Sequence, residues 1–156
     1  GFACAGGLGV ALRCDLRVAE ETARFAVLSR RWGVPMSDGT TVRLPRLIGA
    51  GRAMDMLLTA RKVSGTEALA IGLADRRVPK GQALVKAIEL AHEIAAFPQI
   101  AMRSDRLSTI KQWDMSLPDA FQQELELAAE ARRKEAQPGA ERFAAGDGRH
   151  GGKANT

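Results

Sequence analysis

A glycine-rich loop at the start of the chain constrains the fold more than any other feature. The segment Gly6–Gly9 (GGLG) leads into the apolar stretch 10–12, so we expect a helix from about Gly6 to Cys14. The first N–H groups of a helix have no intrahelical partner and lie at the positive end of its dipole. Because glycines let a ligand oxygen approach closely, the loop suits a phosphate or the negative oxygen of a thioester-derived enolate.

Of two other interpretations of this loop, one fails on its residues and the other stays open. A dinucleotide-binding G-x-G-x-x-G pattern fails, because Leu12 stands at the third glycine position and we expect no strand before the loop. Tight packing of the helix against a sheet is the alternative without a ligand. The glycines by themselves do not separate packing from binding.

The first half of the chain predicts an α/β arrangement. Alternating apolar residues predict strands at 15–19 and 23–28, and Gly33, Pro35 and Gly39 mark a loop. Helices are expected at 40–48, after Gly51, and at 64–72, where Ser64 and Glu67 form a capping box; an extended link follows at 73–78. We assign residues 1–78 to this α/β part.

The second half predicts helices only, over residues 79–145. Residues 82–96 form the clearest amphipathic helix, with Leu84 and Ile88 expected to face inward. Further helices are expected at 100–112 and 118–136, a break at Pro138–Gly139, a short helix at 140–145, and a flexible tail at 146–156.

Composition excludes several classes of function. The net charge of +5 is dispersed, and no aromatic residues alternate with the basic ones as in a single-strand binding surface, so we expect no nucleic-acid partner. No apolar run is long enough to cross a membrane, and the two cysteines fit no metal spacing, so neither a membrane nor a metal is expected. We expect a cytoplasmic location, and a fragment, because Gly1 opens abruptly inside a motif.

Several ordered blocks of the first hundred residues resemble the crotonase superfamily, which includes enoyl-CoA hydratases and isomerases. Residues 1–15 (GFACAGGLGVALRCD) resemble its N-G-[FY]-A-x-G-G-G-x-E-L-A-x-x-C-D signature. Residues 39–49 (GTTVRLPRLIG) resemble G-G-T-x-R-L-x-R-x-x-G, and residues 53–60 with 67–74 resemble A-x-x-L-x-L-T-G and E-A-x-x-x-G-L-V. Beyond Pro98 the resemblance is weaker.

The resemblance implies the C-terminal portion of a spiral of ββα units, followed by a helical region that often builds trimers. It implies an acyl-CoA thioester as ligand, with coenzyme A as part of the substrate and no separate cofactor, and a homotrimer or hexamer. Two backbone N–H groups polarise the thioester carbonyl in the family, and one falls on Gly6 here. Gly7, Leu8 and Trp32 are the other expected substrate-binding residues, although packing is an alternative role for Trp32.

The usual catalytic acids of the family are replaced in this sequence. Gly9 stands at the position of the first glutamate of hydratases, and Ser29 aligns with the second. Neither residue can do carboxylate acid/base work at neutral pH, so we expect no ordinary hydration by the family mechanism.

Asp38 is the nearest substitute acid or base in the sequence. The aspartate that works in some family branches would fall on Ser37, one residue away, a shift that a glycine-rich loop can absorb. Aspartate is also a common turn residue with no catalytic duty. Three functions therefore remain open: an acyl-CoA enzyme, a non-catalytic acyl-CoA-binding protein, and a structural trimer partner.

Overall fold

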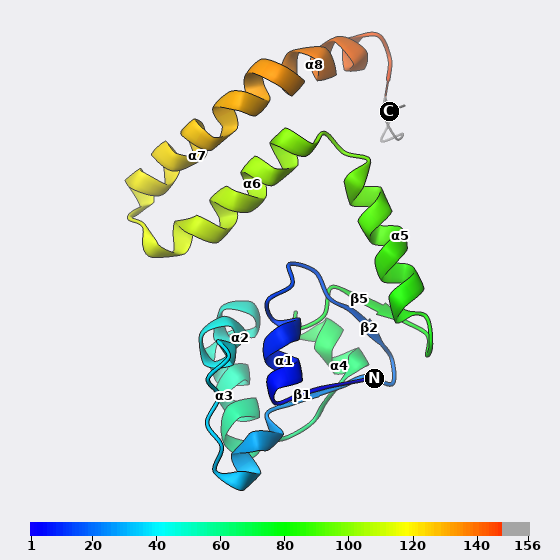
Figure 1. Cartoon of the computed structure of the whole chain (residues 1–156), viewed down its shortest axis with the longest axis vertical. Coiled ribbons are helices and arrows are strands. Elements are labelled where there is room, and N and C mark those ends of the chain that lie inside the picture. The colour runs from blue at the N-terminus through cyan, green and yellow to red at the C-terminus, as the bar shows by residue number, and fades with distance from the viewer. Residues whose placement is uncertain (148–156) are drawn as a thin grey trace. The chain divides into compact units, whose positions relative to one another are not determined.

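The computed structural model describes residues 1–147, and the predicted tail from residue 148 onward lies outside them. The chain divides into two compact units, Gly1–Leu90 and a second unit that begins at Ala91 (Figure 1). The first unit contains the glycine loop and every strand found within residues 1–147, and the described part of the second unit is helical. Among the described helices, none combines the length and the apolar character needed to span a membrane.

The glycine loop follows a strand. Strand β1 (Phe2–Cys4) leads into helix α1 (Gly6–Ala11), so our expectation of no preceding strand is wrong. Three residues are too few to show a period of two, and β1 is defined by its parallel partner β3 (Arg24–Ala26), which lies about twenty positions along the chain. Helix α1 also ends earlier than expected, at Ala11.

Two small sheets frame the first unit. Strand β3 pairs with β1 on one side and antiparallel with β4 (Val63–Ser64) on the other, whereas β2 (Val18–Glu20) pairs in parallel with β5 (Arg76–Val78). The strand expected at 15–19 thus begins three residues later. The reason lies at Arg17. Its main-chain N–H and its side chain both bind Asp75, and these contacts keep the residues before Arg17 out of the strand.

The strand expected at 23–28 is shorter than predicted. It gives way after Ala26 to a 3₁₀ helix, η1 (Leu28–Trp32), which ends at Gly33 in a left-handed conformation with a φ of 69°. The sequence there continues with apolar residues, Val27 and Leu28, so its hydrophobicity alone favoured a longer strand.

Three helices complete the first unit: α2 (Thr40–Ile48), α3 (Ala50–Thr59) and α4 (Gly65–Ala70). The predicted bounds of α2 are confirmed despite Pro45, because the carbonyl that this proline leaves without a partner belongs to the exposed Thr41. Ser64 caps α4 as expected, and its hydroxyl accepts the N–H of Glu67 at 3.1 Å.

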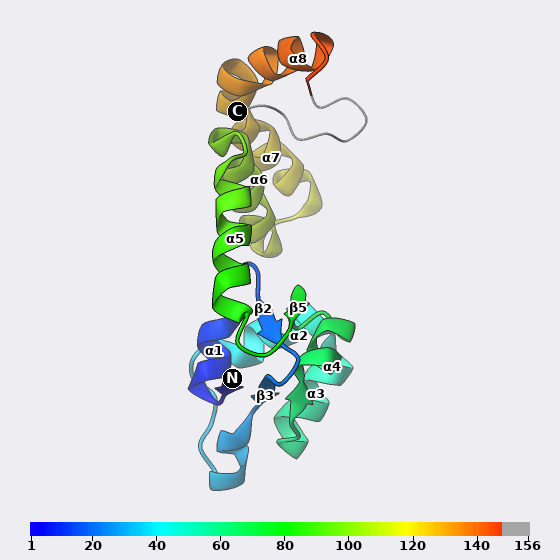
Figure 2. The same ribbon diagram turned by 90° about the vertical axis from the view of Figure 1, so that its right-hand side faces the viewer.

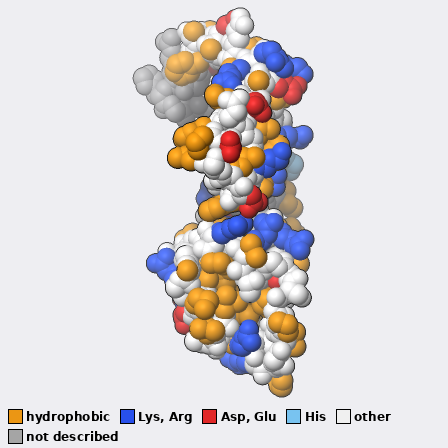
Figure 3. Space-filling view, turned by 90° about the vertical axis from the view of Figure 1, so that its left-hand side faces the viewer, with side chains coloured by type: hydrophobic (Ala, Val, Ile, Leu, Met, Phe, Trp, Pro, Cys, Tyr) orange, Lys and Arg blue, Asp and Glu red, His pale blue; other side chains and the backbone are white. Residues whose placement is uncertain are grey.

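The core of the first unit lies between these helices and the larger sheet. Its fully enclosed side chains include Leu8 from α1, Leu44 from α2, Met56 from α3 and Leu73 after α4. Apolar side chains also remain exposed on α2 and α3: Val42, Leu47, Met54 and Leu58. Figure 3 shows hydrophobic groups on that face of the first unit.

Helix α5 (Ala83–Ala95) contains the boundary between the two units. The prediction that Leu84 and Ile88 face inward is wrong for the described part of the chain, where their side chains are 72% and 48% exposed. The amphipathic pattern therefore marks an apolar face that nothing in the described residues covers.

The second unit is built on α6 (Gln99–Lys111) and α7 (Leu117–Ala131), which run side by side in both Figure 1 and Figure 2. A 3₁₀ turn, η2 (Gln112–Asp114), joins them. Ser116 caps α7, as the sequence predicts, and accepts the N–H of Asp119. The carboxylate of Glu135 accepts the N–H groups of Ile100 and Ala101 at 3.0 and 2.8 Å, so it caps the start of α6.

The expected break at Pro138–Gly139 does not occur. A π-helical turn, η3 (Arg132–Ala136), follows α7 directly and continues into α8 (Gln137–Ala144), which begins one residue before Pro138. A π turn replaces the usual i→i−4 hydrogen bonds and so accommodates a residue that cannot donate one. The short helix expected at 140–145 is the end of α8.

Candidate functional site

The site begins at a strained turn between β1 and α1. Ala5 has φ 49° and ψ −124°, a conformation that residues with a side chain rarely adopt. Its N–H donates to the carbonyl of Ala26 at 3.0 Å, and its own carbonyl accepts the N–H groups of Leu8 and Gly9 at 2.9 and 3.3 Å. These bonds fix the direction in which the helix leaves the strand.

Gly6 and Gly7 present free backbone N–H groups at this turn. Neither N–H has a protein partner within residues 1–147, both residues are exposed, and no atom lies within 4 Å of the position that a Cβ on either would take. The side chain of Leu8, by contrast, is fully buried in the core. Leu8 therefore anchors α1 from within, while Gly6 and Gly7, the two residues before it, face outward.

The third glycine of the loop lies against a carboxylate. Gly9 is buried, and a Cβ built on it would overlap Oδ2 and Cγ of Asp38 and approach Oδ1 to 2.9 Å. The structure thus brings together two residues that the sequence analysis considered separately. Gly9 lies three residues after Gly6 on α1, about 4.5 Å further along the helix axis.

Two neighbours hold Asp38 in this place. The N–H of Thr40 donates to Oδ1 at 3.0 Å, and Nη2 of Arg13, which follows α1, donates to the main-chain carbonyl of Asp38 at 3.4 Å. Partial burial acts to raise the pKa of Asp38. The hydroxyl and N–H of Thr40, the N–H of Asp38 itself and the positive charge of Arg13 outweigh it and lower the pKa below its usual value.

Ser29, which replaces the second family glutamate, lies in η1 and is half-buried. Its hydroxyl donates to the sulfur of Met36 at 3.1 Å, so it is occupied in holding the loop that leads to Asp38. A hydroxyl of this kind has no titration near neutral pH and cannot substitute for a carboxylate.

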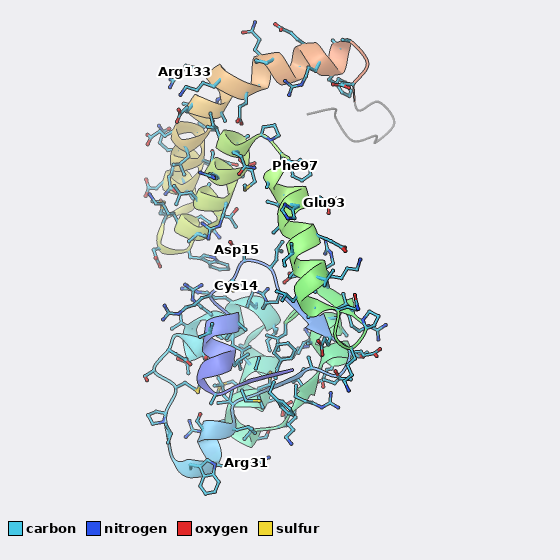
Figure 4. The ribbon with its side chains drawn as sticks, turned by 45° about the vertical axis from the view of Figure 1, so that its right-hand side comes forward. Cys14, Asp15, Arg31, Glu93, Phe97 and Arg133 are labelled. Carbon is cyan, nitrogen blue, oxygen red and sulfur yellow. The ribbon has the colours of Figure 1, made fainter. Side chains whose placement is uncertain are left out.

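Trp32 also lies in η1, where its side chain is 82% exposed. The described residues therefore form no wall around it. Arg30 and Arg31 donate to main-chain carbonyls of Leu57 and Ala60 at 3.4 and 3.5 Å. Figure 4 shows Arg31 at the end of the first unit opposite Cys14 and Asp15, which follow α1.

Thr40 and Arg13 are site residues that the sequence analysis missed. Each is defined by its contact with Asp38, from α2 and from the residues after α1, and no local motif signals such a pairing. The one available signal was Gly9, which stands where the family signature has a glutamate and so leaves room for a side chain from elsewhere in the fold. No group of three potential metal ligands occurs among the residues that the structure describes.

Comparison with known proteins identifies the family. The family model described as enoyl-CoA hydratase/isomerase matches residues 1–146. Enoyl-CoA hydratase EchA19 of Mycobacterium tuberculosis is 41% identical over 104 residues, which are 67% of this chain and 39% of that protein. Short-chain-enoyl-CoA hydratase of Clostridium acetobutylicum is 33% identical over 126 residues, 80% of this chain and 48% of that protein.

Solved structures show the same fold. The enoyl-CoA hydratase EchA1 of Mycobacterium marinum superposes with a TM-score of 0.89 and 31% identity, over 93% of this chain and 58% of that one. The enoyl-CoA hydratase of Bacillus anthracis gives a TM-score of 0.87 and 32% identity, over 93% and 57%. The chain spans less than half the length of the two curated relatives described above. Its fold, its glycine turn and these matches together show that it belongs to the enoyl-CoA hydratase/isomerase family of the crotonase superfamily.

Proposed function

We propose that this chain contributes part of a site that binds an acyl-CoA thioester and stabilises the enolate derived from it. One observation carries the proposal: the Asp38 carboxylate lies beside Gly9, one helical turn from the free N–H groups of Gly6 and Gly7. A hydrogen-bond donor for a developing oxyanion and a base for an acidic C–H are the two groups that enolate formation needs. Coenzyme A would enter as part of the substrate, with no separate cofactor.

In this proposal the N–H of Gly6 donates a hydrogen bond to the carbonyl oxygen of the thioester. The family resemblance assigns a second N–H to a segment that precedes the glycine motif in relatives. The chain alone therefore supplies one donor, with Gly7, Leu8 and Trp32 as further expected contributors to substrate binding. The side chain of Leu8 would act only through packing, since it is fully buried.

Asp38 would act as the acid/base in place of the glutamate that Gly9 replaces. Its lowered pKa keeps the carboxylate ionised at neutral pH, the form that can accept a proton. As the C–H bond next to the thioester carbonyl breaks, the proton would pass to Asp38. The electron pair would move toward the carbonyl oxygen, where the N–H of Gly6 stabilises it. Hydration by paired glutamates is not expected, because Gly9 and Ser29 stand at both positions.

The experiment uses the protein that carries this chain, with a thioester labelled with ¹³C at its carbonyl. We expect saturable binding, a downfield shift of the carbonyl resonance, and exchange of the acidic C–H for deuterium in D₂O. Asp38→Asn should abolish the exchange and keep the binding. An unshifted carbonyl resonance in the bound thioester would contradict the oxyanion role of Gly6.

The alternative is a non-catalytic acyl-CoA-binding protein, which the free N–H groups of Gly6 and Gly7 support equally well. It predicts binding with no deuterium exchange in either the wild type or Asp38→Asn. A structural trimer partner predicts no binding at all.

We also propose a homotrimer or hexamer, which follows from the resemblance, and a cytoplasmic location. Both cysteines are free thiols, Cys14 exposed and Cys4 half-buried, which suits a reducing compartment. Light scattering on the purified protein tests the assembly, and fractionation of cells tests the location.

A further inference from the structure

The hydroxyl of Thr40 is a buried polar group without a hydrogen-bond partner. Its side chain is fully enclosed, and Oγ1 makes no hydrogen bond within the described residues. A buried hydroxyl left unpaired destabilises a fold, and such groups in native proteins need a reason. Valine would fill the same volume without this penalty.

The surroundings of Thr40 point to Asp38 as that reason. Thr40 is the first residue of α2 and follows Gly39, which turns the chain with a φ of 90°. This turn directs the N–H of Thr40 to Oδ1 of Asp38 at 3.0 Å. The hydroxyl of the same residue makes no hydrogen bond within the described residues, and it acts to lower the pKa of Asp38.

Gly9 closes the other side of the carboxylate. Because Gly9 has no side chain, Oδ2 and Cγ of Asp38 lie where its Cβ would be. We propose that Thr40 is a positioning residue: its N–H holds the Asp38 carboxylate over Gly9, and its hydroxyl, which has no other partner within the described residues, turns to donate to the same carboxylate. The assignment of that carboxylate to acid/base work rests on the proposed function.

The charged groups near this turn do not supply the same constraint. Arg13 binds the main-chain carbonyl of Asp38, not its carboxylate. Nε of Arg43, one turn into α2, lies 3.9 Å from the position that a Cβ on Gly39 would take. Arg13 favours the ionised carboxylate through space, but a hydroxyl on a short, buried side chain fixes its orientation.

Two matched variants test the role of Thr40. Thr40→Val keeps the N–H and the volume and removes the hydroxyl, whereas Thr40→Ser keeps the hydroxyl. The readout is the titration of the Asp38 side-chain carbon, followed by ¹³C NMR in the folded protein that carries this chain. We expect Thr40→Val to raise the pKa of Asp38 by roughly one unit, and Thr40→Ser to restore most of the wild-type value.

A purely structural Thr40 gives a different result. Removal of an unpaired buried hydroxyl would then be neutral or stabilising, with the Asp38 titration unchanged in Thr40→Val, and that outcome would overturn the proposal. The titration is independent of any ligand. If Thr40→Val shifts the titration of Asp38 but the protein binds no thioester, the role of Thr40 holds and the proposed function is refuted. If Thr40→Val leaves the titration of Asp38 unchanged while deuterium exchange depends on Asp38, the proposed function holds and the role of Thr40 is refuted.

Discussion

The Asp38 carboxylate occupies the volume that a side chain on Gly9 would need. A Cβ on Gly9 would overlap Oδ2 and Cγ, and Oδ1 would lie 2.9 Å away. The two positions come from α1 and from the loop before α2, so the absence of a side chain in one element makes room for a carboxylate from another. Glutamate at position 9, as in the family signature, and Asp38 in its present place are mutually exclusive in this structure.

Substitution of Gly9 should therefore displace Asp38. We expect Gly9→Ala to lower the free energy of unfolding by about 1–3 kcal/mol, the usual effect of overpacking, in urea denaturation of the protein that carries this chain. Gly7→Ala is the matched control on the same helix, because its Cβ meets no atom within 4 Å, and it should be neutral or stabilising by about 0.5–1 kcal/mol. Asp38→Gly should recover most of the loss in the Gly9→Ala background, and strict additivity of the two changes would refute the contact.

The elements that the sequence predicted well are those with local signals. The bounds of α2 and the cap of α4 by Ser64 follow from periodicity and from a short motif, and both are confirmed. Strand β1 was missed because its three residues are defined by pairing with β3. The continuation of the helix through Pro138 was missed because a π turn at 132–136 absorbs the proline, and no residue pattern announces such a turn.

The candidate site divides in the same way. The free N–H groups of Gly6 and Gly7 could be predicted, since a glycine loop before a helix is visible in the sequence. The position of Asp38 could not, because it depends on a loop that Thr40 and Arg13 hold against α1. The sequence showed the loss of an acid at Gly9 and the presence of one at Asp38, but only the fold shows that they share one volume.

The pH dependence of stability should report on Asp38. Partial burial acts to raise its pKa in the folded protein, but the hydroxyl and N–H of Thr40, followed by the N–H of Asp38 and the charge of Arg13, lower it. A depressed carboxyl pKa stabilises the fold fully above the unfolded-state value of about 3.9, and this stabilisation disappears as the pH falls through the lower folded value. As the pH falls from about 5 to about 2, the Asp38→Asn variant should therefore lose less stability than the wild type. Parallel unfolding curves for the two proteins would contradict the lowered pKa.

A buried ion pair ties β2 to the segment before β5. The guanidinium of Arg17 is only 7% exposed; it lies 3.0 Å from Oδ2 of Asp75 and also donates to the carbonyls of Leu73 and Cys14 at 2.7 and 2.6 Å. Asp75→Ala leaves this buried cation without its counter-ion and should destabilise the fold by roughly 3 kcal/mol in urea denaturation. The exposed pair Lys86–Glu89 is the control, where Glu89→Ala should change stability by less than about 0.5 kcal/mol.

The turn at Ala5 should store strain. A side chain at φ 49° and ψ −124° typically destabilises the backbone by about 1–3 kcal/mol, and glycine removes most of that strain at some entropic penalty in the unfolded chain. Ala5→Gly should therefore raise the melting temperature. Ala60→Gly is the comparison, since Ala60 lies in the ordinary left-handed region with φ 52° and ψ 30° and should gain less. An equal or larger gain at Ala60 would show that the Ala5 turn is not strained.

Close approach of two backbones should make Gly65 intolerant of any side chain. A Cβ there would overlap the carbonyl oxygen of Glu20 and lie 2.9 Å from its carbonyl carbon and 3.2 Å from Cα of Glu21. These atoms belong to the main chain at the end of β2, so no rotamer change can relieve the overlap, and α4 would have to move away from the sheet. We expect Gly65→Ala to destabilise the fold by roughly 3 kcal/mol, the upper part of the range for overpacking. Gly51→Ala, at an open position in the first turn of α3, should be neutral or stabilising. Similar melting temperatures for the two variants would mean that α4 and β2 do not approach as the structure shows.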